Sequence, residues 1–126
     1  MHSLPIFLRL SGAPVILIGE GEAVEAKRRL LLRAGAILVE EGGEARIGFI
    51  ALEGAAADAA AARLRARGLL INVADRPELC DFTLPAIIDR DPVLVAIGTG
   101  GASAGLAAAL RQRLEAILPA GLGALA

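Results

Sequence analysis

The feature that most constrains the fold is the alternation of short apolar runs with helical patterns in the first part of the chain. Strand-like runs occur at 15–18, 37–39, 46–52 and 69–73, and helical patterns occur at 22–34 and 55–67. Apolar runs without polar alternation are typical of parallel strands that are buried on both faces. The pattern therefore predicts an α/β fold with a parallel sheet and right-handed crossovers.

One connection departs from this pattern. Only six residues, mostly Glu and Gly, separate Val39 from Arg46. A parallel crossover needs a dozen or more residues. Either the second and third strands form an antiparallel pair, or one strand–helix unit of an ordinary dinucleotide-binding fold is missing here.

The pattern changes after Asp75. Strand-like residues at 82–88 and 93–97 flank a short polar turn, which predicts a β-hairpin. A last helix is expected at about 103–118, with Ser103 as its N-cap. The chain is therefore expected to divide into an α/β part at residues 1–75 and a small hairpin–helix region at 76–126.

The turn after the first strand carries part of a phosphate-binding fingerprint. Gly19 allows a tight turn and Gly21 allows close approach of a pyrophosphate, but Val24 stands where a third small residue is expected. The amides that begin the next helix attract anions, whereas the carboxylate of Glu22 repels them. The loop alone is equally consistent with a cofactor site and with a plain strand–helix turn.

Acidic residues follow two of the predicted strands. Glu40 lies about twenty residues beyond the glycine loop, where an acid binds the ribose hydroxyls of NAD and disfavours the 2′-phosphate of NADP. Glu41 is an alternative, and a solvated charged loop is the simpler explanation for both. Asp75 follows the fourth strand and is a candidate general base, although turn chemistry alone favours a plain turn aspartate beside Pro77.

Composition excludes several functional classes. The net charge is −1, Tyr and Trp are absent and only three Phe are present, so we expect no nucleic-acid partner. Residues 92–110 lack charge, but the glycines in their middle favour a strand, a turn and a helix over a membrane span, so no membrane association is expected. The single Cys80 cannot form an internal disulfide, which fits the cytoplasm. The sequence has no cluster of Cys and His residues, so we expect no resident metal.

A series of motifs in order is more specific than any of these features. It comprises Leu4-Pro5-Ile6-Phe7, the Gly-x-Gly loop, Asn72-Val73-x-Asp75, Phe82-x-x-Pro85-Ala86-Ile87-Ile88-Asp89-Arg90 and Val95-Ala96-Ile97-x-Thr99-Gly100-Gly101-x-Ser103. The series resembles the precorrin-2 dehydrogenase / sirohydrochlorin ferrochelatase family, the N-terminal module of siroheme synthase. The resemblance covers nearly the whole chain.

The resemblance implies a homodimer with a Rossmann-like NAD domain and a small dimerisation region. It implies NAD-dependent oxidation of precorrin-2 to sirohydrochlorin and, in many members, insertion of ferrous iron. Asp75 matches the family's catalytic aspartate. The positions that match cofactor contacts are Gly19, Gly21, Glu22, Ala23 and the stretch from Glu40 to Gly43. Those that match the substrate cleft are Asn72, Thr99, Gly100, Gly101 and Ser103.

Two departures from the family pattern bear on activity. Glu20 replaces a glycine of the cofactor loop, and the short connection after Val39 stands where the family carries a further strand and helix. These departures motivate an alternative, a degenerate module that binds tetrapyrrole or a partner without turnover. A second alternative is a structural subunit whose hairpin only dimerises.

Overall fold

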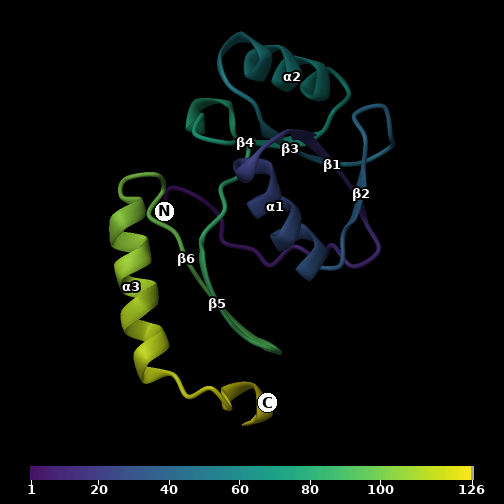
Figure 1. Cartoon of the computed structure of the whole chain (residues 1–126). Helices are drawn as coiled ribbons and strands as arrows, with labels where there is room; N and C mark the ends of the chain where they lie inside the picture. Colours follow the sequence, from purple (N-terminus) through teal and green to yellow (C-terminus); the bar gives the residue numbers. More distant parts are fainter. Residues whose placement is uncertain (126) are drawn as a thin grey trace. The chain divides into compact units, whose positions relative to one another are not determined.

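The computed structural model describes residues 1–125, and the chain forms two compact units (Figure 1). One unit is Pro5–Phe82, and the other combines Met1–Leu4 with the chain from Thr83 onward. The expected domain boundary after Asp75 lies inside the first unit. Among the described residues, none of the helices combines the length and the apolarity needed to cross a bilayer.

The first unit is a four-stranded parallel sheet with two long helices, as the alternation predicts. Its elements are β1 (Pro14–Gly19), α1 (Glu22–Arg33), β2 (Ile37–Val39), β3 (Ile47–Ala51), α2 (Gly54–Ala66) and β4 (Leu70–Val73), followed by a short 3₁₀ turn at Pro77–Leu79. The strand order is β2-β1-β3-β4. This is the doubly wound order without its outermost strand, so the expected reduced Rossmann-like fold is confirmed.

The register explains how seven residues can join β2 to β3. The two strands lie on opposite sides of β1, and Ile16 is level with Val39 on one side and with Gly48 on the other. The connection therefore spans two strand spacings, about 10 Å, without running back along the sheet. The antiparallel alternative is wrong, because both strands are parallel to β1 and do not pair with each other.

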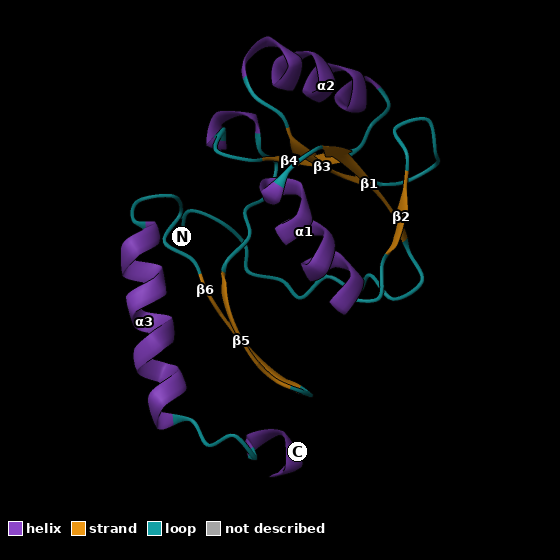
Figure 2. Ribbon diagram, viewed as in Figure 1, coloured by secondary structure: helices purple, strands orange, loops and turns teal. Residues whose placement is uncertain are grey.

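The two helices cover opposite faces of the sheet (Figure 2). Successive strand residues point to opposite faces, so Val15 packs with Leu31 of α1 whereas Ile16 packs with Leu64 of α2. Alanines give α2 a close fit, and a Cβ on Gly48 would lie 2.5 Å from Leu64 Cδ1, so the buried Leu64 side chain would have to move. Both faces of the sheet are therefore apolar, which is why its strands can be recognised in the sequence as continuous apolar runs.

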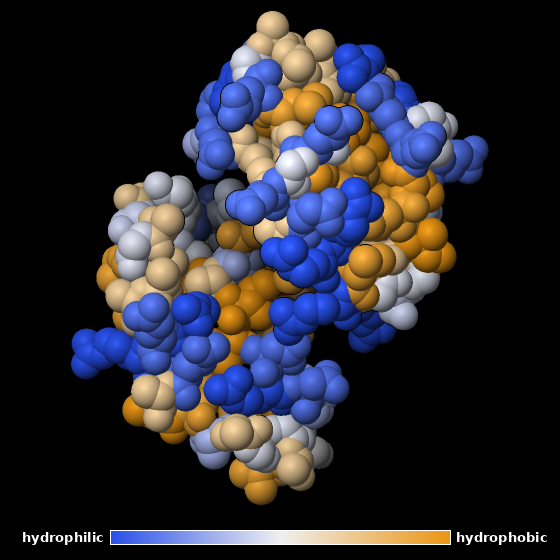
Figure 3. Space-filling view, in the orientation of Figure 1, coloured by the Kyte–Doolittle hydropathy of each residue, from blue (hydrophilic) through white to orange (hydrophobic). Residues whose placement is uncertain are grey.

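The outer surface of this unit is mixed. The solvent face of α1 carries charged side chains and is hydrophilic in Figure 3. By contrast, Leu32 on α1 and Ile37 on the edge strand β2 are 54% and 55% exposed. The missing outermost strand would lie beside this edge, and removing an edge strand leaves the hydrogen bonds of the inner strands intact.

The second unit contains the expected hairpin and helix. Strands β5 (Ala86–Arg90) and β6 (Val93–Ile97) pair antiparallel, and α3 spans Ala104–Ile117. Ser103 caps α3 as predicted, since its hydroxyl accepts a hydrogen bond from the Leu106 amide at 2.9 Å. Two boundaries differ from expectation. Residues 82–85 precede the strand, and residues 89–90 extend β5, so the turn is confined to Asp91 and Pro92.

Candidate functional site

An open hollow of about 680 Å³ lies at the carboxyl ends of β1, β3 and β4. In open parallel sheets, this edge is where ligands bind. The side chains of the first unit that meet there come from three successive strand ends. The lining residues are Ile18, Gly19, Glu20, Ala23, Ala51, Leu52, Glu53, Gly54, Ala74, Asp75 and Arg76.

The two glycines of the first loop are needed for different reasons. Gly19 has φ 134°, and a Cβ there would lie 2.4 Å from the carbonyl oxygen of Ala51 on the neighbouring strand. Gly21 has φ 87°, but an added Cβ would meet nothing within 4 Å. Gly19 therefore permits close packing of β1 on β3, whereas Gly21 leaves space above the helix end.

The start of α1 is open to a ligand. Gly21 is the N-cap, and within the described chain no side chain caps this helix end. The amide of Glu25 is the first to bond back, to the Gly21 carbonyl at 3.1 Å. Earlier amides of a helix have no intrahelical partner and form a ready anion site. Ala23 lines the hollow, while Glu22 is exposed beside it.

Asp75 stands at the end of β4 in an unusual conformation. The Ala74 amide donates to the Ile50 carbonyl at 2.9 Å, which extends the ladder to the edge of the hollow. The next residue, Asp75, turns the chain with φ 59°, the only non-glycine positive φ in the described chain. Aspartate tolerates this conformation better than most residues. Its exposed carboxylate lines the hollow and makes no hydrogen bond or ion pair within residues 1–125.

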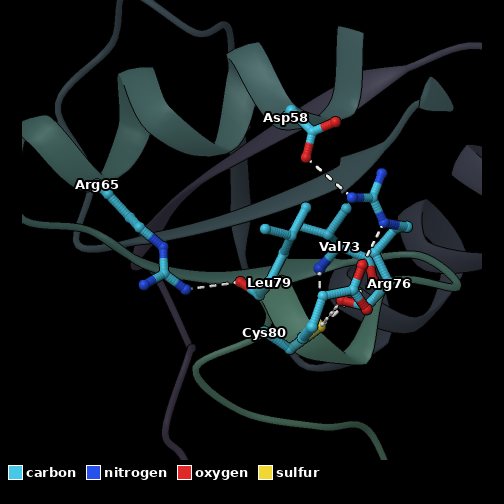
Figure 4. A network of polar contacts seen from close by, with 7 residues as sticks. Asp58, Arg65, Val73, Arg76, Leu79 and Cys80 are labelled. Atoms are coloured by element: carbon cyan, nitrogen blue, oxygen red, sulfur yellow. Dashed lines mark hydrogen bonds and ion pairs between the residues drawn. The ribbon is translucent and has the colours of Figure 1, made fainter. Parts of the chain in front are cut away.

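The cation next to it is already paired, as Figure 4 shows. Arg76 donates to Asp58 of α2 at 2.9 Å and also to Glu78. The hydrogen bond from Arg76 holds the pKa of the Glu78 carboxyl below its ordinary value. Because this guanidinium is committed, the carboxylates of Glu20, Glu53 and Asp75 give the hollow a negative character.

The segment after this turn closes the free edge of β4. The Val73 amide donates to the Cys80 sulfur at 3.2 Å, and the Ile71 amide donates to the Asp81 carboxylate at 2.9 Å. Asn72 is 6% exposed and donates its side-chain amide to the Phe82 carbonyl at 2.9 Å. Asn72, expected at the substrate cleft, is therefore engaged inside the first unit and does not line the hollow.

The stretch after β2 also lies outside the hollow lining. Glu40 is exposed at the end of β2, and Glu41 receives two hydrogen bonds from Arg63 of α2, at 2.7 and 2.9 Å. These bonds hold the pKa of the Glu41 carboxyl below its ordinary value. The Gly43 carbonyl accepts from Arg67 at 2.6 Å. Of the two candidate acids for ribose binding, Glu41 is therefore bound by Arg63, whereas Glu40 has no partner among residues 1–125.

The remaining predicted positions belong to the second unit. Thr99 Oγ1 accepts from the Ser103 amide at 3.1 Å and donates to the Ser103 carbonyl at 3.0 Å. Gly100 and Gly101 both have positive φ, and they complete the turn before α3. These residues shape the start of that helix, and their substrate role remains a prediction.

Sequence reasoning missed the loop after β3. Leu52, Glu53 and Gly54 line the hollow opposite the glycine loop. The signal was available, since the rule that ligands meet the carboxyl ends of strands applies to the third strand as well as to the fourth. No group of three or more His, Cys, Asp or Glu in the described part of the chain is placed to hold a metal ion.

Comparisons with known proteins agree with this architecture. A model of an NAD(P)-binding protein family matches residues 43–86. The siroheme synthase of Methylococcus capsulatus is 41% identical and that of Thiobacillus denitrificans 40% identical, over 100% and 99% of this chain. The solved structure of SirC, a precorrin-2 dehydrogenase, superposes with a TM-score of 0.74 at 18% identity, covering 97% of this chain and 74% of SirC.

This chain covers only part of each synthase, and it is also shorter than the region that it matches. The chain spans about a third of each of these two synthases, 33% and 32%. The Methylococcus match extends over 155 residues, whereas this chain has 126, so the synthase carries additional residues within the matched region. That difference fits the missing strand–helix unit after β2. The resemblance to siroheme synthases that the motif series indicated is therefore confirmed over the whole of this chain, which is shorter than the matched region.

Proposed function

We propose that this chain is an NAD-dependent precorrin-2 dehydrogenase of siroheme biosynthesis, producing sirohydrochlorin. The observation that supports this most directly is the hollow in which the glycine loop and Asp75 meet. The 41% and 40% identity to two siroheme synthases over this chain supports a substrate of siroheme biosynthesis.

The residues present fit NAD at this hollow. Space above Gly21 and the uncapped start of α1 suit a pyrophosphate, and the close packing at Gly19 brings the loop against β3. Gly19, Gly21 and Ala23 would hold the cofactor largely through backbone, with Glu22 beside them. Bound NAD supplies the hydride acceptor.

In this proposal Asp75 removes a proton from precorrin-2. Its carboxylate is exposed, lines the hollow and has no partner in the described chain, so it is available as a base. Oxidation removes two hydrogens from the substrate, one as hydride to NAD and one as a proton. The paired Arg76 leaves Asp75 without a neutralising neighbour on its own turn.

We extend the proposal to assembly and location. The exposed apolar residues of the second unit, among them Leu94, Leu106 and Ile117, suit a homodimer interface. Thr99, Gly100, Gly101 and Ser103 remain the predicted substrate contacts, whereas the side chain of Asn72 is held by the Phe82 carbonyl and does not line the hollow. A cytoplasmic location suits a chain whose single Cys80 is free. Insertion of ferrous iron stays a prediction from the resemblance.

A non-catalytic binding module is the second candidate. It is favoured by Glu20, whose carboxylate lines the hollow where the family usually has a glycine. Like charge disfavours a pyrophosphate at this position. Such a module would bind tetrapyrrole or a protein partner without turnover, and Asp75 variants would then behave like the parent chain.

Titration calorimetry with NAD separates the two. The dehydrogenase proposal predicts saturable heat and a rise in thermal midpoint, since a ligand that binds only the folded state stabilises it. Gly21→Ala should remove both, because its methyl group fills the space left for the pyrophosphate. A folded chain that shows neither heat nor a shift with millimolar NAD contradicts the proposal.

A further inference from the structure

The connection Glu40–Arg46 crosses the sheet on the side covered by α2. Val39 and Ala45, at its two ends, pack against the core cluster that contains the α2 alanines. The path of the connection therefore depends on its contacts with α2.

Two arginines one turn apart on α2 hold this connection. Arg63 donates from Nε and Nη2 to the two carboxylate oxygens of Glu41, at 2.7 and 2.9 Å. Arg67 donates to the main-chain carbonyls of Glu41 and of Gly43, the latter at 2.6 Å. Residues at positions i and i+4 lie on one helix face, so both side chains reach the same loop. Planar guanidinium groups with two-point contacts fix orientation as well as distance.

The two acids that follow β2 differ in whether their carboxylates are already bound. Both carboxylate oxygens of Glu41 are used by Arg63, and the Arg63 charge is in turn compensated by Glu41. The neighbouring Glu40 is exposed, and its carboxylate has no partner among residues 1–125. Its position at the carboxyl end of β2 places it at the same sheet edge as the glycine loop after β1.

We infer that Arg63 and Arg67 are positioning residues for cofactor choice in this shortened fold. They fix the connection so that Glu40 faces the ribose of the adenosine half, and they keep Arg63 from attracting a 2′-phosphate. The inference rests on the proposed NAD-dependent function. It assigns to α2 the support that the missing strand and helix would give the loop.

The test compares dissociation constants for NAD and NADP by calorimetry. The parent chain should prefer NAD by about tenfold or more, as one like-charge contact with a 2′-phosphate predicts. The ratio should fall to about one in Glu40→Gln and in the double variant Arg63→Ala with Arg67→Ala. Arg65→Ala is the matched control. It lies on the same helix but bonds to Leu79 and Asp81, so its ratio should match the parent's.

A second variant keeps the test decisive if the double variant does not fold. Glu41→Ala leaves both arginines and removes only the carboxylate that neutralises Arg63, so NADP affinity should rise while NAD affinity stays within about threefold. If Arg63 and Arg67 only stabilised the fold, their replacement would weaken the binding of NAD and of NADP by the same factor. An unchanged ratio in the folded double variant or in Glu41→Ala overturns the positioning role alone. Failure of the parent chain to bind either dinucleotide overturns the proposed function together with it.

Discussion

Gly19 and Ala51 pair in register at the ends of β1 and β3, and a Cβ on Gly19 would lie 2.4 Å from the Ala51 carbonyl oxygen. Gly21, two residues on, has open space at the same point. Gly19→Ala should therefore destabilise the fold by about 1–3 kcal/mol or more, since both strain and a backbone collision act. Urea unfolding measures this loss.

Gly21→Ala serves as the matched comparison. Its positive φ alone should cost about 1 kcal/mol relative to glycine, while NAD binding should be lost. The two variants should thus separate, with Gly19→Ala mainly affecting folding and Gly21→Ala mainly affecting the cofactor. Equal effects of both on stability and binding would show that the loop does not divide its roles in this way.

The conformation of Asp75 predicts an order of stability. At φ 59°, glycine is relaxed, aspartate and asparagine are tolerated, and alanine is strained by about 1–2 kcal/mol. Asp75→Asn should therefore fold like the parent, and Asp75→Gly should be at least as stable. Denaturant unfolding of the three variants tests this order. An alanine variant as stable as the parent would mean that the turn has another conformation in solution.

The Glu41–Arg63 pair predicts how stability depends on pH. Arg63 lowers the pKa of Glu41 from its ordinary value of 4.5, so at acidic pH the unfolded chain binds the proton more readily than the folded chain. The stabilisation is fully present above pH 4.5 and disappears as pH falls through the folded-state pKa. The unfolding free energy of the parent should exceed that of Glu41→Gln at neutral pH, and the difference should shrink in acid. A difference that is independent of pH would exclude this pair as its source.

The homodimer proposal can be tested on the hairpin. Leu94 is 45% exposed on β6 and pairs across the hairpin with Asp89, so Leu94→Lys keeps a favourable cross-strand contact. Light scattering should give about twice the mass of one chain for the parent and a shift toward monomer for this variant. Leu70→Lys, at a 56% exposed position of the first unit, is the control and should leave the mass unchanged. A monomeric parent chain would contradict the proposal.

Most of the first unit was predictable because its strands are buried on both faces. Apolar runs such as Val15 to Ile18 and the glycines that end each helix mark the elements directly. The hairpin boundaries were harder, because Asp89 and Arg90 look like turn residues. They belong to β5 because the hairpin ladder continues through them, pairing Asp89 with Leu94 and Arg90 with Val93.

The candidate site was only partly visible from sequence. Strand ends pointed to the glycine loop and to Asp75, and both line one hollow. The pairing of Arg63 with Glu41 joins residues far apart in the chain, and no local pattern encodes such a contact. The same holds for Asn72, whose amide is engaged by the Phe82 carbonyl rather than left free at the strand end.

Direct turnover tests the central claim that this shortened chain is a dehydrogenase. The protein would be mixed with precorrin-2 and NAD without oxygen, and the spectra of sirohydrochlorin and NADH followed, with Asp75→Asn as the folded control. We predict that both products form in equal amounts and that the rate falls about 100-fold or more in Asp75→Asn, as expected for loss of a general base. A folded parent chain that forms neither product, or an Asp75→Asn variant as fast as the parent, would contradict the account.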